Sequence, residues 1–310
     1  MIPELRLDTT ASWCYISIMM TPRDRLFAAL EGRPTDRAPA WLLFPYHPTG
    51  YYADVRQDPS FRLVVEAVER EGRAITLDRR HLGVSLFAPE VVSRHEEAPE
   101  AGVRIRRDAL EYQGRHLAAE TRQGPDGAEV QKLLRSAEDL EFYCSLPVCT
   151  DPARIHAELD RQLPHLRQEI AEFPRDLGAM MLDLGEPVGP LYHSACLDEY
   201  PVWSLTHADL VQGFLDRVME QKRIVYRYCL ERDLADVYFL VGSELASPPM
   251  VSRATFQRWI VPYAKELIAL IHAHGKKAIQ HYHGQIREIL PDFVTMAPDA
   301  LHTIEAPPVG

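Results

Sequence analysis

Two histidines in the short run IQHYHGQ have the type and spacing to bind a metal ion. His281 and His283 are two residues apart, so in a strand both side chains would lie on one face, with Cα atoms roughly 6.5 Å apart. Gly284 follows them and precedes a predicted helix. One histidine in a strand is usually a hydrogen-bonded core residue, whereas two on one face at a strand end favour a functional site.

A carboxylate ends the next predicted strand, ALHTIE. Glu305 would reach the same mouth, because neighbouring parallel strands end at one edge of a sheet. Two imidazoles and a carboxylate can form a three-ligand site with an open position, as in catalytic zinc centres. The spacing alone leaves this metal site and a buried hydrogen-bonded cluster equally open.

Other polar residues follow earlier predicted strands. Glu244 could be a fourth ligand, a general base, or a carboxylate at a helix start. Glu186 occupies the equivalent place one unit earlier, and Tyr192 and His193 come shortly after it. These three are candidate substrate contacts, although solvation of a loop would also explain them.

An aromatic group follows the first predicted strand. Tyr46, His47 and Tyr51 would face the functional end of the sheet. Such loops can clamp a ligand, and they can equally cover a barrel mouth without binding anything.

The elements that must position these residues alternate along the chain. Short apolar runs and amphipathic stretches succeed one another, which is typical of a parallel sheet flanked by helices. The predicted strands are Ala38 to Phe44, Ala74 to Asp78, Gly178 to Leu184, Asp236 to Gly242, Lys277 to His283 and Ala300 to Glu305. The predicted helices begin with one at Pro22 and continue at about Ser60 to Glu71, Pro152 to Phe173, His207 to Arg232, Ser252 to His274 with a kink at Pro262, and Gln285 to Thr295.

The pattern contains six strand–helix units, whereas a closed barrel of this kind takes eight parallel strands. We therefore expect an α/β fold, a TIM (β/α)8 barrel truncated at its C-terminus. Residues 103–135 alternate polar and apolar side chains between turn signals, and this indicates an antiparallel insertion. Residues 1–19 lack the downstream pattern and are expected to be a disordered or non-native extension, with 20–310 forming one incomplete barrel domain.

Composition excludes several classes of protein. The formal charge of -11 repels phosphate backbones and anionic lipids, so nucleic acid is not an expected partner. No apolar run approaches the roughly 20 residues of a membrane span. The five scattered cysteines contain no CxxC pair, which is typical of a reducing compartment and predicts a cytoplasmic location.

Three stretches carry a resemblance to a known family: MTPRDRLFAALEGRPTDRAPAW, the run from VSRATFQRW to REILPD, and DALHTIEAPP. They resemble the uroporphyrinogen decarboxylase superfamily, over nearly all of the chain from Met20 onward. That superfamily includes zinc-dependent methylcobalamin:coenzyme M methyltransferases. Their His-x-Cys-Gly motif matches His281 and His283, and the similar cobalamin-independent methionine synthases add a glutamate that matches Glu305.

This resemblance implies a zinc-dependent methyltransferase that moves a methyl group from a corrinoid or a small methylated donor to a thiol-type acceptor. A corrinoid protein would be a partner, and a homodimer is a further expectation. The family cysteine is a histidine here, and a last cysteine ligand would lie past Gly310. The resulting all-N/O site is harder than its sulfur-containing counterpart.

Two alternatives stay open. In the decarboxylase branch an aspartate that Asp78 could match supports the substrate, while arginines hold its carboxylates. The loop after the first strand lacks those arginines, which ranks decarboxylation second. The other alternative is a catalytically silent or truncated barrel, whose open sheet would expose edges and apolar surface.

Overall fold

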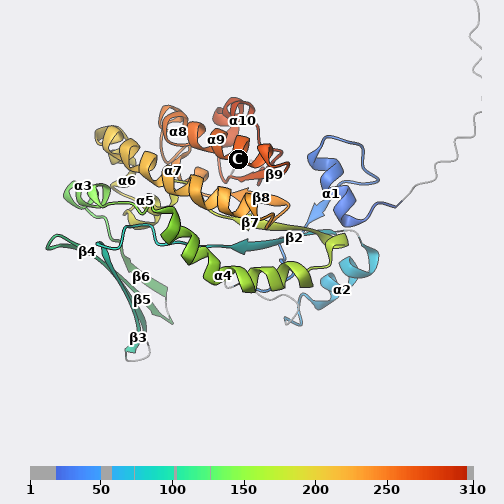
Figure 1. The fold of residues 1–310 in the computed structure, drawn as a ribbon, viewed down its shortest axis with the longest axis horizontal. Coiled ribbons are helices and arrows are strands. Elements are labelled where there is room, and N and C mark those ends of the chain that lie inside the picture. Colours follow the sequence, from blue (N-terminus) through green and yellow to red (C-terminus); the bar gives the residue numbers. More distant parts are fainter. Residues whose placement is uncertain (1–18, 50–57, 73, 101–102, 126, 306–310) are drawn as a thin grey trace, which may run out of the picture.

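The computed structural model describes residues 19–49, 58–72, 74–100, 103–125 and 127–305. Its centre is a parallel sheet of six strands in the order β1-β2-β7-β8-β9-β10 (Figure 1). The strands are β1 (Ala40–Trp41), β2 (Ala74–His81), β7 (Gly178–Asp183), β8 (Val237–Leu240), β9 (Lys277–His281) and β10 (Ala300–His302). The six strands expected from the sequence are therefore confirmed.

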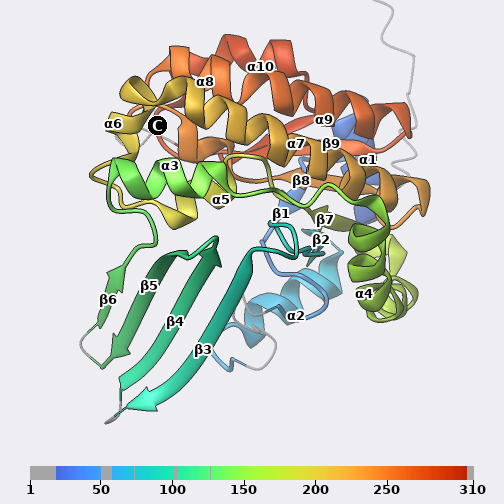
Figure 2. The same cartoon turned by 60° about the vertical axis from the view of Figure 1, so that its left-hand side comes forward.

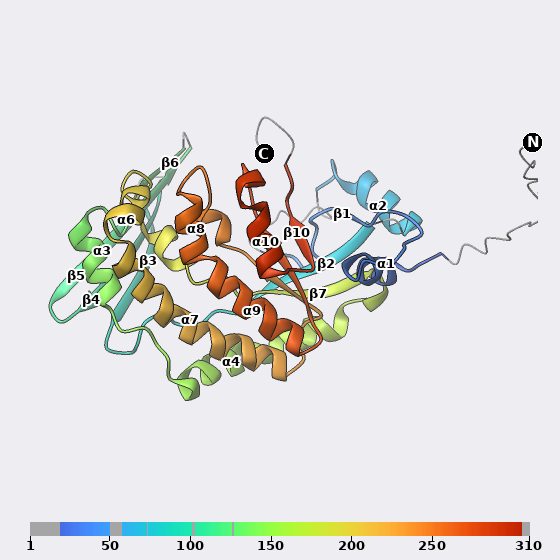
Figure 3. The same cartoon turned by 90° about the horizontal axis from the view of Figure 1, so that it is seen from above.

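The sheet is curled into an open half-barrel with β1 and β10 at its edges (Figure 3). The curl brings side chains of the two edges together, since the ring centroids of Trp41 and His302 are 4.7 Å apart. β7 and β8 are buried along their whole length, as expected for strands covered on both faces. The described part of the chain is therefore an α/β half-barrel of six parallel strands.

The two faces of the sheet bury different residues, because successive side chains of a strand alternate. The concave face and helix α1 (Pro22–Leu30) share one core, whereas the outer face packs against the other helices. The concave core consists of Leu26, Ile75, Leu77, Ala179, Met181, Val237, Phe239 and Ile279.

Helices lie outside the sheet, with α4, α7 and α9 running beside one another (Figures 1 and 3). Beyond α1 they are α2 (Arg62–Glu71), α3 (Ala137–Ser145), α4 (Pro152–Glu172), α5 (Gly189–Ser194), α6 (Tyr200–Thr206), α7 (Ala208–Glu231), α8 (Arg253–Trp259), α9 (Val261–Ala273) and α10 (Leu290–Met296). None of the helices in the described part of the chain has both the length and the apolar character needed to cross a bilayer.

Several predicted boundaries need correction. The kink expected at Pro262 is a break, with Ile260 between α8 and α9, because proline has no N–H to continue the helix. The first strand is two residues long rather than spanning Ala38 to Phe44. β9 ends at His281 and β10 at His302, so His283 and Glu305 lie just beyond their strands.

The antiparallel insertion is a separate four-stranded sheet that projects from the helical layer (Figure 2). Its strands are β3 (Val92–Glu100), β4 (Val103–Tyr112), β5 (Arg115–Gly124) and β6 (Gly127–Gln131). The sheet begins earlier than the predicted 103–135, because β3 has too few apolar residues to be recognised. Gln113 and Gly114, both at positive φ, make the expected two-residue turn between β4 and β5.

Candidate functional site

His281 and His283 lie side by side at the carboxyl end of β9. Their ring centroids are 4.5 Å apart and the rings are nearly perpendicular. His281 lies on the concave face, like Ile279 two residues earlier, and its ring packs against Phe239 of β8 at 5.5 Å. His283, just beyond β9, is 56% exposed.

Glu305 meets His283 as the sequence predicts. Its Oε1 lies 2.9 Å from His283 Nδ1, and its Oε2 accepts a hydrogen bond from the backbone N–H of Gly284 at 2.5 Å. These two interactions, that of Gly284 first, lower the pKa of Glu305. The carboxylate is therefore ionised and fixed beside the imidazole.

His302 is a member of the cluster that sequence reasoning missed. It is the register partner of His281 on the neighbouring strand, and the two Nδ1 atoms are 2.7 Å apart. Trp41 and Phe239 pack against its ring, at 4.7 and 5.7 Å between centroids. The alternation of Ala300 and His302 in the last strand was the signal that could have identified it.

Burial keeps both inner imidazoles neutral. It lowers the pKa of His281 and of His302 to about 4, and neighbouring imidazoles and Arg79 add to this effect. At neutral pH each ring therefore presents an unprotonated nitrogen, the form that binds metals.

The four donors meet as two pairs, His281 with His302 and His283 with Glu305. Across the described ranges, no group of three or more His, Cys, Asp or Glu side chains is already arranged to hold a metal ion. The donor chemistry, three imidazoles and a carboxylate, suits zinc. Bringing the pairs into one coordination sphere requires side-chain rotation, which the exposure of His283 permits.

A buried ion pair borders the histidines. Arg79 of β2 binds Asp183 of β7, with Nε donating to Oδ2 at 3.1 Å, and its guanidinium lies 5.0 Å from the ring centroid of Phe239. Both side chains are less than one tenth exposed. Neither residue was singled out from the sequence: the predicted strand stopped at Asp78, before Arg79, and Asp183 lay inside the predicted strand Gly178 to Leu184.

Glu186 is buried behind the site rather than exposed to substrate. Its Oε2 accepts hydrogen bonds from the backbone N–H of Ser243, at 3.0 Å, and from the Ser243 hydroxyl. Burial raises the pKa of Glu186 to about 7.

Glu244 lies beside Ser243 and is the acidic candidate nearer to the mouth. Burial raises its pKa, while hydrogen bonds, including that from the backbone N–H of Gly242 at 2.9 Å, and the charge of His283 oppose the rise. A carboxylate with a raised pKa close to the histidines is a reasonable proton acceptor.

Asp78 and His47 lie on the other face of the sheet. Asp78 is fully buried, and its register partner Met180 belongs to the core under the helices. It binds His47 twice, through the backbone N–H at 2.9 Å and through Nδ1 at 2.6 Å. The structure therefore does not bring Asp78 to the histidine cluster.

The remaining candidates are also apart from the cluster. Tyr46 packs edge-on against Phe173, just after α4, at 5.7 Å. Tyr192 packs against Tyr200, and the carbonyl oxygen of His193 accepts a hydrogen bond from Lys132. Tyr51 lies outside the described residues.

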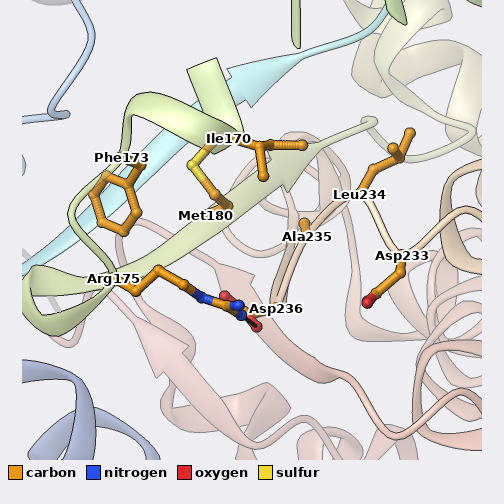
Figure 4. A pocket seen from close by; sticks show the side chains of 8 residues that line it. All are labelled: Ile170, Phe173, Arg175, Met180, Asp233, Leu234, Ala235 and Asp236. Atoms are coloured by element: carbon orange, nitrogen blue, oxygen red, sulfur yellow. Dashed lines mark ion pairs between the residues drawn. The ribbon is translucent and has the colours of Figure 1, made fainter. Parts of the chain in front are cut away.

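A cavity of about 200 Å³ lies at the opposite, amino-terminal end of β7 and β8 (Figure 4). Arg175 and Asp236 form an ion pair of 3.6 Å in its wall, and Asp236 also binds Arg23 of α1 at 2.9 Å. The charged groups of this cavity are thus already neutralised, and we assign it no function.

No family model and no curated protein matches this sequence. A solved structure to which the chain is similar is a methyltransferase from Methanosarcina mazei, with 16% identity, a TM-score of 0.49, and coverage of 91% of this chain and 75% of that chain. A likeness of this size leaves the fold and the activity to be argued from the residues themselves.

Proposed function

We propose that this protein is a metal-dependent methyltransferase with His281, His283 and Glu305 as zinc ligands. The observation that carries the proposal is the position of these three side chains around the carboxyl ends of β9 and β10, with His283 between the other two. His283 Nδ1 lies 2.9 Å from Glu305 Oε1, and the ring of His281 lies 4.5 Å from that of His283. The motif resemblance to corrinoid-linked methyltransferases supports methyl transfer as the reaction.

Zinc bound there would supply Lewis acidity that lowers the pKa of a substrate thiol or hydroxyl. The protein's own side chains set the charges around the site. Glu305 stays ionised through the backbone N–H of Gly284 and His283, while His281 stays neutral through burial. The ion pair of Arg79 and Asp183 forms the wall of β2 and β7 beside them.

In the proposed reaction, the proton of the acceptor S–H passes to a carboxylate oxygen of Glu244. The sulfur electron pair then forms the bond to the methyl carbon, and the bond between that carbon and its donor breaks, leaving its electrons on the donor. The donor is a methylated corrinoid, carried by a corrinoid protein or free, or a small methylated compound.

Decarboxylation of a polyanionic porphyrinogen has less support. Such a substrate needs available guanidinium groups. Arg79, which lies on the concave face, is already paired with Asp183, and Asp78 is bound to His47 on the opposite face.

Two measurements on one set of proteins test the proposal. Zinc content is compared in the wild type, in His283→Ala and in the control His272→Ala, whose imidazole binds Asp299 before β10. Loss of methyl from methylcobalamin to a small thiol is then followed by absorbance. We expect bound zinc and turnover in the wild type and the control, and loss of both in His283→Ala. An unchanged zinc content in His283→Ala would contradict the proposal.

A further inference from the structure

His302 occupies a place that the three proposed ligands leave unexplained. It faces His281 directly across the pairing of β9 and β10, and both rings lie on the concave side of the sheet. The rings are stacked, with 27° between their planes and 5.0 Å between centroids. Two imidazole nitrogens from neighbouring strands therefore lie next to each other.

The Nδ1 atoms of His281 and His302 are within hydrogen-bonding distance of each other. The Nδ1 atoms are 2.7 Å apart. Two nitrogens that bind one tetrahedral zinc at its usual bond length lie roughly 3.3 Å apart. A separation increase of about half an ångström would turn this contact into a pair of ligands.

The packing around His302 fixes its ring orientation. Trp41 of β1 and Phe239 of β8 contact the ring, and Phe239 also contacts His281. A metal ligand binds well when packing sets its rotamer before the ion arrives, and the ring of His302 is held in this way.

We propose that His302 is a direct metal ligand, completing with His281, His283 and Glu305 a set of three imidazoles and one carboxylate. This inference rests on the proposed metal site and extends it. It identifies the ion as a borderline divalent metal that prefers nitrogen, such as zinc or cobalt, rather than a thiophilic one. The His281–His302 pair is the more buried of the two, so in the metal-bound protein His283 and Glu305 would have to turn toward it, with Glu305 giving up its hydrogen bond to Gly284.

Cobalt provides a readout that depends only on what touches the metal. The variant His302→Cys is purified as the full chain, and Co²⁺ is added to it. A ligand at this position gives a new cobalt–thiolate charge-transfer band that the wild type lacks. The control His272→Cys, which alters an imidazole bound to Asp299 near the amino end of β10, gives no such band.

Affinity is measured on a second variant. His302→Phe keeps an aromatic ring against Trp41 and Phe239 but cannot bind metal. Loss of an outer partner of a ligand costs roughly 10- to 100-fold in affinity, so we expect calorimetric zinc affinity to fall by more than about 100-fold. If this variant does not fold, as seen by circular dichroism, the cobalt band of His302→Cys decides.

The outcomes separate this inference from the proposed function. A cobalt spectrum of His302→Cys equal to that of the wild type overturns the role of His302 and leaves the methyltransferase proposal intact. Metal bound through His302 without methyl transfer overturns only the proposed activity. A wild-type protein that binds neither cobalt nor zinc overturns both.

Discussion

Around the carboxyl ends of β7 to β9, burial decides which side chains carry a charge. His281 is neutral because burial and the nearby His302, His283 and Arg79 lower its pKa, whereas Glu305, which is less buried, keeps its charge. Glu186 lies deeper, and burial brings its pKa to about 7. These differences between neighbouring residues are the means by which one site can hold both a neutral ligand and a proton acceptor.

Glu186 should make stability depend on pH. Its folded pKa of about 7 exceeds the ordinary 4.5, so its contribution is complete below pH 4.5 and is lost as pH rises through 7. The loss amounts to roughly 3 kcal/mol. Urea denaturation should therefore show the stability of Glu186→Gln, relative to the wild type, rising between pH 5 and pH 8. If the difference in stability between the two proteins is the same at both pH values, the raised pKa of Glu186 is wrong.

The pair of Arg79 and Asp183 should be intolerant of single changes. Asp183→Ala removes the carboxylate that the buried guanidinium of Arg79 binds and should cost about 3 to 5 kcal/mol. The double variant Arg79→Met/Asp183→Leu removes both charges and should recover most of this loss, as measured by chemical unfolding. A double variant as unstable as Asp183→Ala alone would show that packing, not charge, controls this position.

At the scale of elements, periodicity predicted the six strands and most of the helices, because burial on one face leaves a pattern along the chain. It could not predict on which face of a strand each polar side chain lies. Asp78 and Arg79 are adjacent, and only the register of β2 against β7 sends Arg79 inward and Asp78 outward. His302 was missed for a related reason: its role comes from facing His281, which is a property of two strands together.

The pairing of β2 with β7 depends on a glycine. A Cβ at Gly178 would lie 1.9 Å from the carbonyl oxygen of Thr76, its register partner. We expect Gly178→Ala to cost more than about 3 kcal/mol, beyond the usual range for point changes. The matched control is Gly213→Ala inside α7, where the added Cβ meets only Arg217 at 3.9 Å and should stabilise the helix by about 0.5 to 1 kcal/mol.

Thermal unfolding of both glycine variants, followed by circular dichroism, checks this expectation. Equal and small effects at the two positions would mean that the close approach of Gly178 to Thr76 relaxes without cost.

At the scale of the whole molecule, β10 is an edge strand of the half-barrel formed by the described residues. Large apolar side chains are exposed on α10 and just after β10: Val294 is 82% and Ile304 is 72% exposed. Unpaired strand edges flanked by apolar surface favour association with other chains.

We therefore expect concentration-dependent self-association, measured by analytical ultracentrifugation. Val294→Lys/Ile304→Lys should weaken it at least tenfold, because lysine blocks an edge by charge and hydration. Leu205→Lys, which changes an equally exposed side chain on α6, is the control and should leave association unchanged. A protein that stays monomeric at all concentrations would contradict the role of the open edge.

The ion pair that joins α1 to the start of β8 has a consequence for how the chain folds. Arg23 and Asp236 are separated by 213 positions, and Arg23 also donates to the carbonyl of Gly178. During synthesis this ion pair cannot form until Asp236 has emerged, long after α1 itself. Contacts of such long range slow folding, so the N-terminal helix should be the last part protected from hydrogen exchange in a refolding experiment.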